Sequence, residues 1–428
     1  MKQTPWRAIR LASLAAVAVV LAACGSDKDT DRGTLASATQ TAAVPKATID
    51  ATVAAMPGLV NLIGGTAKCD VAFNRIMYGT RDPANQQVSA SAGVLIPSGT
   101  GCTGPYPIVV YHHGTTVIKA DTMSSPTNGE AQLMMLMFAA QGYVVVMPDY
   151  LGYSGSTLSY TPYLNADNTA VVSIDALRAG RRLLTDKGLA HNGKLFLSGY
   201  SQGGHAAMAT QRALERDHPF ELPVTASSPL AGPYALAKTV LDGLDAPVAG
   251  ASVFTPMLLI GAQKAYGDVY TAASDVFQSP WVNGIETLLP GTLSFEQLII
   301  QAKLPLALTG AGGLLTDSFV TRYKADANFS ARKRVAQNDL LNFKPQAPTQ
   351  LCQGSRDPTV PVANMTSAVS YFASQGVTVT AVDVEQVPTL KPVIDAQVAA
   401  AGSLSTYHGT IIPPLCASVA KAFFDPRK

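Results

Sequence analysis

The hydrophobic and polar positions of the first folded stretch predict an antiparallel hairpin. Segments 71–78 and 88–96 are rich in β-prone residues. They flank Gly79-Thr-Arg-Asp-Pro83, whose glycine, aspartate and proline are typical of a turn.

Beyond this hairpin, short and wholly apolar segments alternate with segments of helix length. This alternation is typical of a mostly parallel sheet with helices on both faces. The expected strands span 107–111, 143–148, 194–197, 223–227, 349–353 and 377–384, and the expected helices span 130–141, 169–187, 203–217 and 362–375.

The alternation stops between residues 235 and 342, where several helices with apolar faces are separated by Gly and Pro. Ser294 followed by Gln297 fits a capping box at the start of one of these helices. We expect a helical cap, or lid, inserted into an α/β core that is formed by residues 49–234 and 343–428. The alternative is a structural insertion unrelated to substrate.

The N-terminus has the features of an export signal. Lys2, Arg7 and Arg10 precede an apolar run over 11–23, which is too short to span a bilayer. The run ends in Leu-Ala-Ala before Cys24, which resembles the lipobox of bacterial lipoproteins. We therefore predict a signal peptide over 1–23 and a lipid on Cys24; an ordinary signal peptide with a chance cysteine is the alternative.

The predicted mature chain begins with a polar stretch, since residues 24–48 contain almost no large apolar side chain. Such a stretch buries too little surface to fold, so we expect a flexible tether. Gly25 and Ser26 follow the predicted lipid site, and neither is acidic. The prediction is a protein exported to the bacterial envelope, with an outer-membrane anchor favoured over retention at the inner membrane, or a secreted protein.

Composition narrows the possible roles. The 428 residues are 47% hydrophobic, enough for a large core, and the formal net charge of +2 includes no block of like charges that would indicate nucleic-acid binding. Apart from Cys24, the cysteines are even in number, which favours disulfides in an exported protein, and their spacing does not suggest a zinc site. Of the three possible pairings we favour Cys69 with Cys102 and Cys352 with Cys416.

The strongest chemical signal is Gly199-Tyr200-Ser201-Gln202-Gly203, placed between an expected strand and an expected helix. A nucleophilic serine needs such a sharp strand-to-helix turn, and small residues two before and two after it relieve crowding. The pattern alone occurs by chance, but its placement is an independent requirement. Ser201 is therefore the predicted nucleophile.

The serine needs a base and a supporting acid, which follow it in the chain in this kind of sheet. Among the six histidines, only His408 lies beyond the last expected strand. Asp357 stands in a Gly- and Pro-rich loop after the strand that follows the cap, so it is the predicted acid. Asp383 and Asp395 are its rivals.

The negative charge that develops on a carbonyl oxygen needs backbone N–H donors. We expect the amide of Gln202 to supply one, and the amide of Thr115, or of Thr116, to supply the other. We also expect the side chains of His113, Tyr150 and Tyr153 to line the substrate pocket. Asp149 is expected instead to hold its own loop by hydrogen bonds.

Taken together, these motifs resemble the α/β-hydrolase superfamily, and within it the secretory lipase and esterase branch with a large helical cap. The resemblance rests on His-His-Gly-Thr at 112–115, Pro-Asp-Tyr-Leu-Gly at 148–152, Gly-Tyr-Ser-Gln-Gly-Gly at 199–204, Arg-Asp-Pro at 356–358 and Tyr-His-Gly at 407–409. Relatives often carry His-Pro-Tyr where this chain has Thr161-Pro162-Tyr163, so no role of that histidine carries over.

The resemblance implies a hydrolase of short- to medium-chain carboxylic esters or acylglycerols, without metal or organic cofactor. Separately, we expect the protein to be a monomer. A serine peptidase or an acyltransferase on the same fold is an alternative. No acidic cluster for a peptide amine is evident in the sequence, whereas acyl transfer cannot be separated from hydrolysis. A non-catalytic surface lipoprotein is the third possibility, although the serine and histidine positions are both filled.

Overall fold

The structure, a computed structural model, describes residues 31–55 and 62–428. Within these residues nine strands form one sheet in the order β1-β2-β3-β5-β4-β6-β7-β8-β9. In chain order the strands are β1 Leu35–Val44, β2 Asp70–Arg81, β3 Gln87–Ser98, β4 Tyr106–His112, β5 Val144–Pro148, β6 His191–Tyr200, β7 Ala226–Leu230, β8 Gln350–Gln353 and β9 Thr380–Asp383.

The sheet has an antiparallel part and a parallel part. β2 and β3 form the predicted hairpin, and β3 pairs antiparallel with β5, after which all pairings from β5 to β9 are parallel. Every residue of β4 is buried, because Val109 and Tyr111 enter the core on one face while Ile108 and Val110 enter the core on the other. The prediction of a mostly parallel sheet buried on both faces is confirmed.

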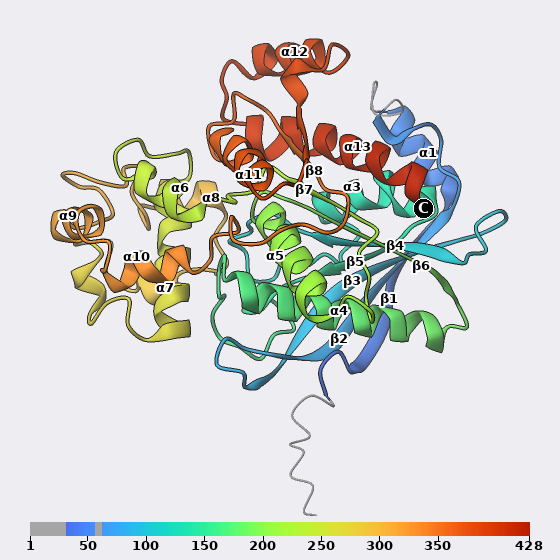
Figure 1. Cartoon of the computed structure of the whole chain (residues 1–428), viewed down its shortest axis with the longest axis horizontal. Helices are drawn as coiled ribbons and strands as arrows, with labels where there is room; N and C mark the ends of the chain where they lie inside the picture. The colour runs from blue at the N-terminus through green and yellow to red at the C-terminus, as the bar shows by residue number, and fades with distance from the viewer. Residues whose placement is uncertain (1–30, 56–61) are drawn as a thin grey trace, which may run out of the picture.

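Helices cover both faces of the sheet (Figure 1). α4 and α5 pack on one face, and α3 and α13 pack on the other. The bounds of the helices outside the cap are α1 Lys46–Ala54, α3 Gly129–Met137, α4 Ala166–Asp186, α5 Gln202–Asp217, α11 Ala363–Ser374, α12 Lys391–Ala401 and α13 Ile412–Phe424.

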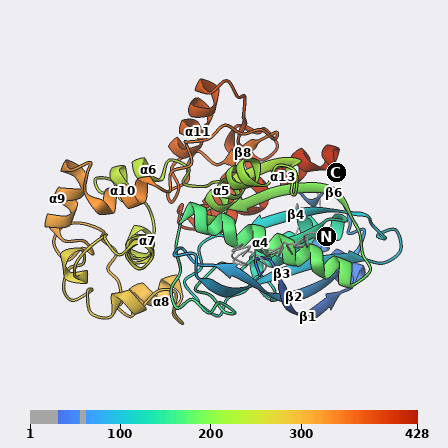
Figure 2. The ribbon, with the colours of Figure 1, turned by 60° about the horizontal axis from the view of Figure 1, so that its bottom comes forward.

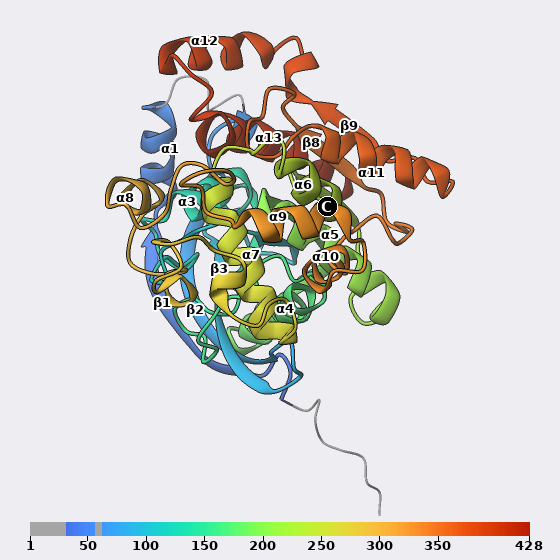
Figure 3. The ribbon, with the colours of Figure 1, turned by 90° about the vertical axis from the view of Figure 1, so that its left-hand side faces the viewer.

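Between β7 and β8 the chain leaves the sheet and forms a separate helical layer, seen at the side of the molecule in Figures 1 and 2 and in front of it in Figure 3. Its helices are α6 Leu236–Gly243, α7 Ala251–Tyr266, α8 Phe295–Ile300, α9 Asp317–Ala325 and α10 Ser330–Ala336. They share a hydrophobic core of their own, and the capping box of Ser294 and Gln297 starts α8. This layer coincides with the predicted cap.

The predicted tether is wrong in its second half. Residues 35–44 form β1, which pairs antiparallel with β2, and α1 follows at Lys46. Most side chains of β1 are exposed, so backbone hydrogen bonds to the edge of β2, rather than apolar burial, hold the strand. Composition could not reveal it, because an edge strand needs few large apolar residues.

Two further differences concern the C-terminal half of the sheet. The strand expected at 223–227 is shifted to Ala226–Leu230, and the sequence does not predict α12.

The predicted signal peptide and the predicted lipid site Cys24 lie outside the described residues. Among the residues that are described, no helix is both long and apolar enough to cross a membrane.

Two disulfides tie distant parts of the chain together. They join Cys69 to Cys102 and Cys352 to Cys416, which are the pairings that the sequence favoured. The first closes the base of the β2–β3 hairpin, and the second links β8 to α13.

Candidate active site

Ser201 occupies a sharp turn between β6 and α5. Its backbone angles are φ 60° and ψ −119°, which L residues rarely adopt. A side chain at either flanking glycine would collide with backbone: a Cβ at Gly199 would lie 2.3 Å from the Gly203 oxygen, and one at Gly203 would lie 1.8 Å from the His112 oxygen. The glycines therefore permit the turn that lifts the serine hydroxyl above the sheet.

The structure brings Ser201, His408 and Asp357 together. The hydroxyl of Ser201 lies 2.8 Å from Nε2 of His408, and Nδ1 of the same ring lies 2.6 Å from Oδ2 of Asp357. The Asp357 side chain is fully buried and that of His408 is 11% exposed. An imidazole held in this way can accept the serine proton while the carboxylate stabilises the resulting charge.

Local backbone structure aims both partners. Asp357 follows β8, and its Oδ1 accepts hydrogen bonds from the amides of Thr359 and Val360, at 2.8 and 3.0 Å. His408 lies in a short π-helical turn, Tyr407–Ile411, that leads into α13. Such turns are often found at functional sites.

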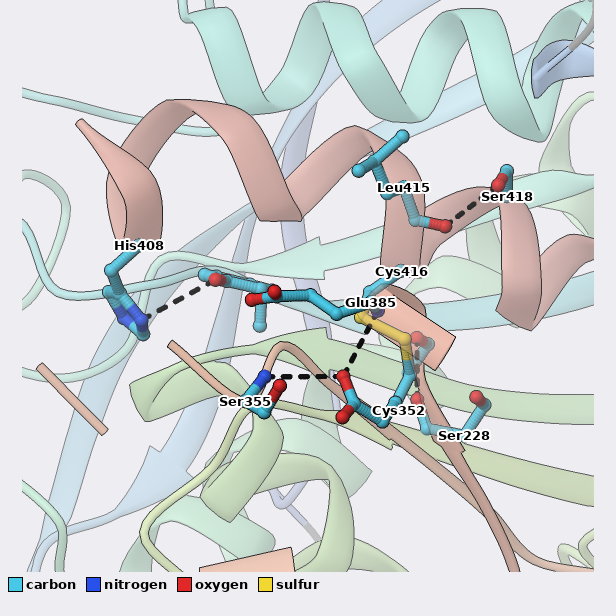
Figure 4. The surroundings of a disulfide bond; sticks show 11 residues. Ser228, Cys352, Ser355, Glu385, His408, Leu415, Cys416 and Ser418 are labelled. Atoms are coloured by element: carbon cyan, nitrogen blue, oxygen red, sulfur yellow. Dashed lines mark hydrogen bonds between the residues drawn. A yellow bond between two sulfur atoms is a disulfide. The ribbon is translucent and has the colours of Figure 1, made fainter. Parts of the chain in front are cut away.

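A buried glutamate joins the two loops behind these residues (Figure 4). Glu385 accepts hydrogen bonds from the amide of Arg356 at 3.1 Å, from the Arg356 guanidinium at 2.6 Å and from the Tyr407 hydroxyl. Arg356 precedes Asp357 and Tyr407 precedes His408. The disulfide Cys352–Cys416 lies in the same region and ties β8 to α13, so both loops are braced twice.

The rival acids are occupied elsewhere. Asp383 accepts hydrogen bonds from the amides of Ser355 and Glu385, and Asp395 forms ion pairs with Arg356 and Lys391. Neither bonds to His408, whose carboxylate partner is Asp357.

Two other histidines near the sheet have structural contacts. His112 contacts the carbonyl of Ser198 and the hydroxyl of Thr210, and His205 contacts the carbonyl of Asn338. Burial lowers the pKa of each ring to about 4. Both are therefore neutral near pH 7 and hold backbone rather than substrate.

The loop after β4 is fixed on nearly every side. Nδ1 of His113 contacts the Gly114 oxygen at 2.7 Å, the Tyr150 hydroxyl donates to the His113 oxygen at 3.0 Å, and the Tyr153 hydroxyl donates to the Thr116 oxygen at 2.8 Å. The cavities bordered by Ser201 do not include these three side chains, and His113 borders a polar cavity along this loop, so their lining of the substrate pocket stays a prediction. They are buried because they hold the loop.

The amides of Thr115 and Thr116 remain available in this loop, because no described residue accepts a hydrogen bond from either. Thr115 borders a cavity with Ser201, and its hydroxyl pairs with that of Tyr163 at 2.7 Å.

Asp149, which the sequence predicts to be a structural residue, accepts hydrogen bonds from the Ser91 hydroxyl and from the amide of Met123.

Sequence reasoning missed Glu130 and the phenol of Tyr200. The Glu130 carboxyl accepts hydrogen bonds from the loop after β4, and burial raises its pKa to about 7. The Tyr200 hydroxyl lies 3.4 Å from Nδ1 of His408. Tyr200 lies within the serine motif, whereas no local pattern distinguishes Glu130 from other acids in a first helical turn.

Two cavities meet at Ser201. The apolar cavity, of about 100 Å³, is formed largely by cap residues such as Leu236, Leu258 and Phe319. The wide cavity, of about 680 Å³, is bordered by His408, Thr115 and Glu130. In the described parts of the chain, no three His, Cys, Asp or Glu residues are grouped so as to hold a metal ion.

A mostly parallel sheet, helices on both faces, a serine on a strained strand-to-helix turn and a helical layer over the site define an α/β-hydrolase. A family model described as "Secretory lipase" matches residues 118–228. No protein of curated function matches.

Solved structures agree with this class. The rice cell wall degrading esterase LipA from Xanthomonas oryzae is 31% identical, with a TM-score of 0.83 over 93% of this chain and 100% of that chain. Candida antarctica lipase A is 18% identical, with a TM-score of 0.59 over 83% of this chain and 77% of its own, and so shares the fold. The chain belongs to the secretory lipase family, and it is a hydrolase of the carboxylesterase and lipase type.

Proposed function

We propose that the protein hydrolyses carboxylic esters through Ser201 as nucleophile, His408 as general base and Asp357 as the supporting acid. The observation that carries this proposal is the continuous hydrogen-bonded chain from the Ser201 hydroxyl through the His408 ring to the Asp357 carboxylate. Family membership supports ester hydrolysis, and this chain of contacts supports the assignment of roles.

In the proposed reaction, Oγ of Ser201 bonds to the ester carbonyl carbon while Nε2 of His408 takes its proton. The carbonyl oxygen becomes an oxyanion that accepts hydrogen bonds from the amides of Thr115 and Gln202. Collapse of this intermediate breaks the carbon–oxygen bond, and His408 returns the proton to the departing alcohol. Water, deprotonated by His408, then releases the acid from the acyl-enzyme in the same way.

The apolar cavity supports an acyl chain of short to medium length. Its volume of about 100 Å³ suits a few methylene groups, and its walls are mainly apolar cap side chains. The wide cavity on the other side of Ser201 has room for the alcohol part of the ester. We therefore expect the cap to determine acyl preference.

A fluorophosphonate probe tests the nucleophile directly. We expect rapid labelling of the wild type, loss of labelling in Ser201→Ala, and full labelling in Ser198→Ala, a matched control on the same strand. A wild type that no fluorophosphonate labels, or labelling that persists in Ser201→Ala, would contradict the assignment.

A panel of p-nitrophenyl esters from acetyl to palmitoyl, with and without detergent, tests the substrate class. We expect the highest kcat/KM with short and medium chains, and a rate increase at an oil–water interface if the cap moves as a lid. A preference for palmitoyl esters would contradict the role given to the apolar cavity.

We also propose that the protein is a monomer, exported and anchored by lipid on Cys24. The family and the two disulfides support export. Metabolic labelling with a palmitate analogue in a bacterial host should mark the wild type and not Cys24→Ala. An unlabelled wild type would contradict the anchor, and light scattering of a chain lacking residues 1–24 measures the oligomeric state.

A further inference from the structure

Glu130 is the carboxylate that holds the loop expected to bind the oxyanion. It stands in the first turn of α3, and both of its oxygens lie 3.1 Å from the amide nitrogen of Gly114. The hydroxyl of Tyr111 donates to Oε1 at 2.7 Å and so orients the carboxyl group. The contact therefore reaches the residue directly before Thr115.

The position of Glu130 is unusual for an acid. No Lys, Arg or His of the described residues forms an ion pair with it, and burial raises its pKa to about 7. It borders both the wide cavity and a polar cavity of about 250 Å³ that lies along the loop after β4. Its side chain is half-buried and lies beside the loop that borders Ser201, which favours a role in the site.

We propose that Glu130 is a positioning residue for the oxyanion hole. By accepting a hydrogen bond from the Gly114 N–H, it orients the loop so that the next amide, that of Thr115, faces the ester carbonyl. This inference rests on the proposed function. It adds a residue that acts through the loop and does not touch substrate in the reaction described above.

The contacts of the loop explain why one acceptor matters. The Gly114 carbonyl oxygen contacts Nδ1 of His113, and the peptide N–H of Thr115 points away from that oxygen because the peptide unit is trans and planar. Glu130 fixes the preceding peptide through the Gly114 N–H. With both peptides held, the direction of the Thr115 N–H is set before substrate binds, which is the condition for oxyanion stabilisation.

The test compares three substitutions in the full-length enzyme. Glu130→Gln retains an oxygen that accepts from the Gly114 N–H, whereas Glu130→Ala removes the acceptor and Glu130→Asp withdraws it by one methylene. Loss of a whole oxyanion donor costs about 10²- to 10³-fold in kcat, so misorientation of one should cost about 10- to 100-fold. We expect that loss in kcat for Ala and Asp, KM within about twofold, and near wild-type values for Gln.

A trifluoromethyl ketone supplies a readout that a purely structural defect would not move. Ser201 adds to its carbonyl carbon, its proton passes to His408, and the resulting hemiketal oxyanion occupies the oxyanion hole. Affinity for this inhibitor should fall in Glu130→Ala by about the same factor as kcat/KM. Glu296→Ala, which changes an exposed glutamate in the first turn of α8, is the matched control and should behave as wild type.

The outcomes are distinct. Glu130→Ala or Glu130→Asp with wild-type kcat, a loss of kcat without loss of inhibitor affinity, or a loss in Glu130→Gln as large as that in Glu130→Ala would each overturn this inference alone. A wild-type protein without activity on any ester would overturn the proposed function and this inference with it. If Glu130→Ala does not fold, the Asp and Gln variants decide.

Discussion

Removing each disulfide in turn separates stability from the geometry of the site. In a chain-entropy treatment, a cross-link lowers the entropy of the unfolded chain by about 2.1 cal/mol/K plus 1.5R ln n, where n is the number of residues in the closed loop. Multiplying this entropy by the temperature gives the stabilisation. With sequence separations of 64 and 33, this gives about 4.3 kcal/mol for Cys352–Cys416 and about 3.7 kcal/mol for Cys69–Cys102 at 25 °C. The two bonds should therefore contribute nearly equally to stability.

The same magnitudes convert to melting temperatures. An unfolding entropy of about 2.1 cal/mol/K per residue, over roughly 390 described residues, is about 0.8 kcal/mol/K. Each double alanine variant should then melt about 4 to 5 °C below the wild type. Differential scanning calorimetry measures these shifts, with the scan rate varied to detect irreversible unfolding.

Activity should distinguish the two variants. Cys352–Cys416 links the strand before Asp357 to the helix after His408. Cys69–Cys102 closes the β2–β3 hairpin, which lies toward the opposite end of the strand order. At a temperature where both variants are folded, we expect kcat on a p-nitrophenyl butyrate substrate to fall about tenfold without Cys352–Cys416 and to stay unchanged without Cys69–Cys102. Equal kcat in both variants would refute the claim that the first disulfide positions the reacting groups.

Four further changes test separate parts of the description. Asp357→Asn keeps the shape of the acid but removes its charge, so kcat should fall about 10⁴-fold; a fall below tenfold would contradict its role. Gly203→Ala would place a Cβ 1.8 Å from the His112 oxygen, so soluble expression or activity should be lost, and an active variant would show that the turn can relax. Burial lowers the pKa of the His205 ring from 6.5 to about 4. Between pH 6.5 and pH 4 the unfolded state therefore binds more protons than the folded state. The stability that comes from the neutral ring is lost as pH falls through this range. The stability of the wild type relative to His205→Gln, measured by urea unfolding, should therefore decrease by about 3 kcal/mol from pH 7 to pH 4, and a constant difference would contradict this. Leu258→Trp narrows the apolar cavity, so octanoyl esters should lose far more kcat/KM than acetyl esters, and a uniform loss would place the acyl chain elsewhere.

The sequence predicts the buried part of the sheet best. Strands such as β4 and β5 are apolar on both faces, so their composition alone distinguishes them from loops. β1 escapes prediction because its small and polar side chains are exposed and its stability comes from backbone pairing with β2. β7, with the sequence Ala-Ser-Ser-Pro-Leu, lacks the branched residues that mark strands, so its position was misplaced by about three residues.

The candidate site is predictable where chain order limits the choice. Ser201, His408 and Asp357 follow from a motif, an elimination and a loop pattern, and the structure brings all three together. The contacts that hold them do not follow in this way. Glu385 and Glu130 act through side-chain contacts with neighbouring loops that no local sequence pattern marks, and the roles of Tyr150 and Tyr153 depend on which way their hydroxyls point.

The separate core of the cap has an evolutionary consequence. Most of its buried residues contact one another, and among the described residues outside 236–336 the buried ones that join it are Val117, Tyr163 and Leu164. Mutations in this layer can therefore reshape the walls around a bound acyl group while the sheet and the reacting side chains keep their packing. Natural selection can therefore change the substrate preference of such a hydrolase through the cap while the catalytic side chains on the sheet stay the same.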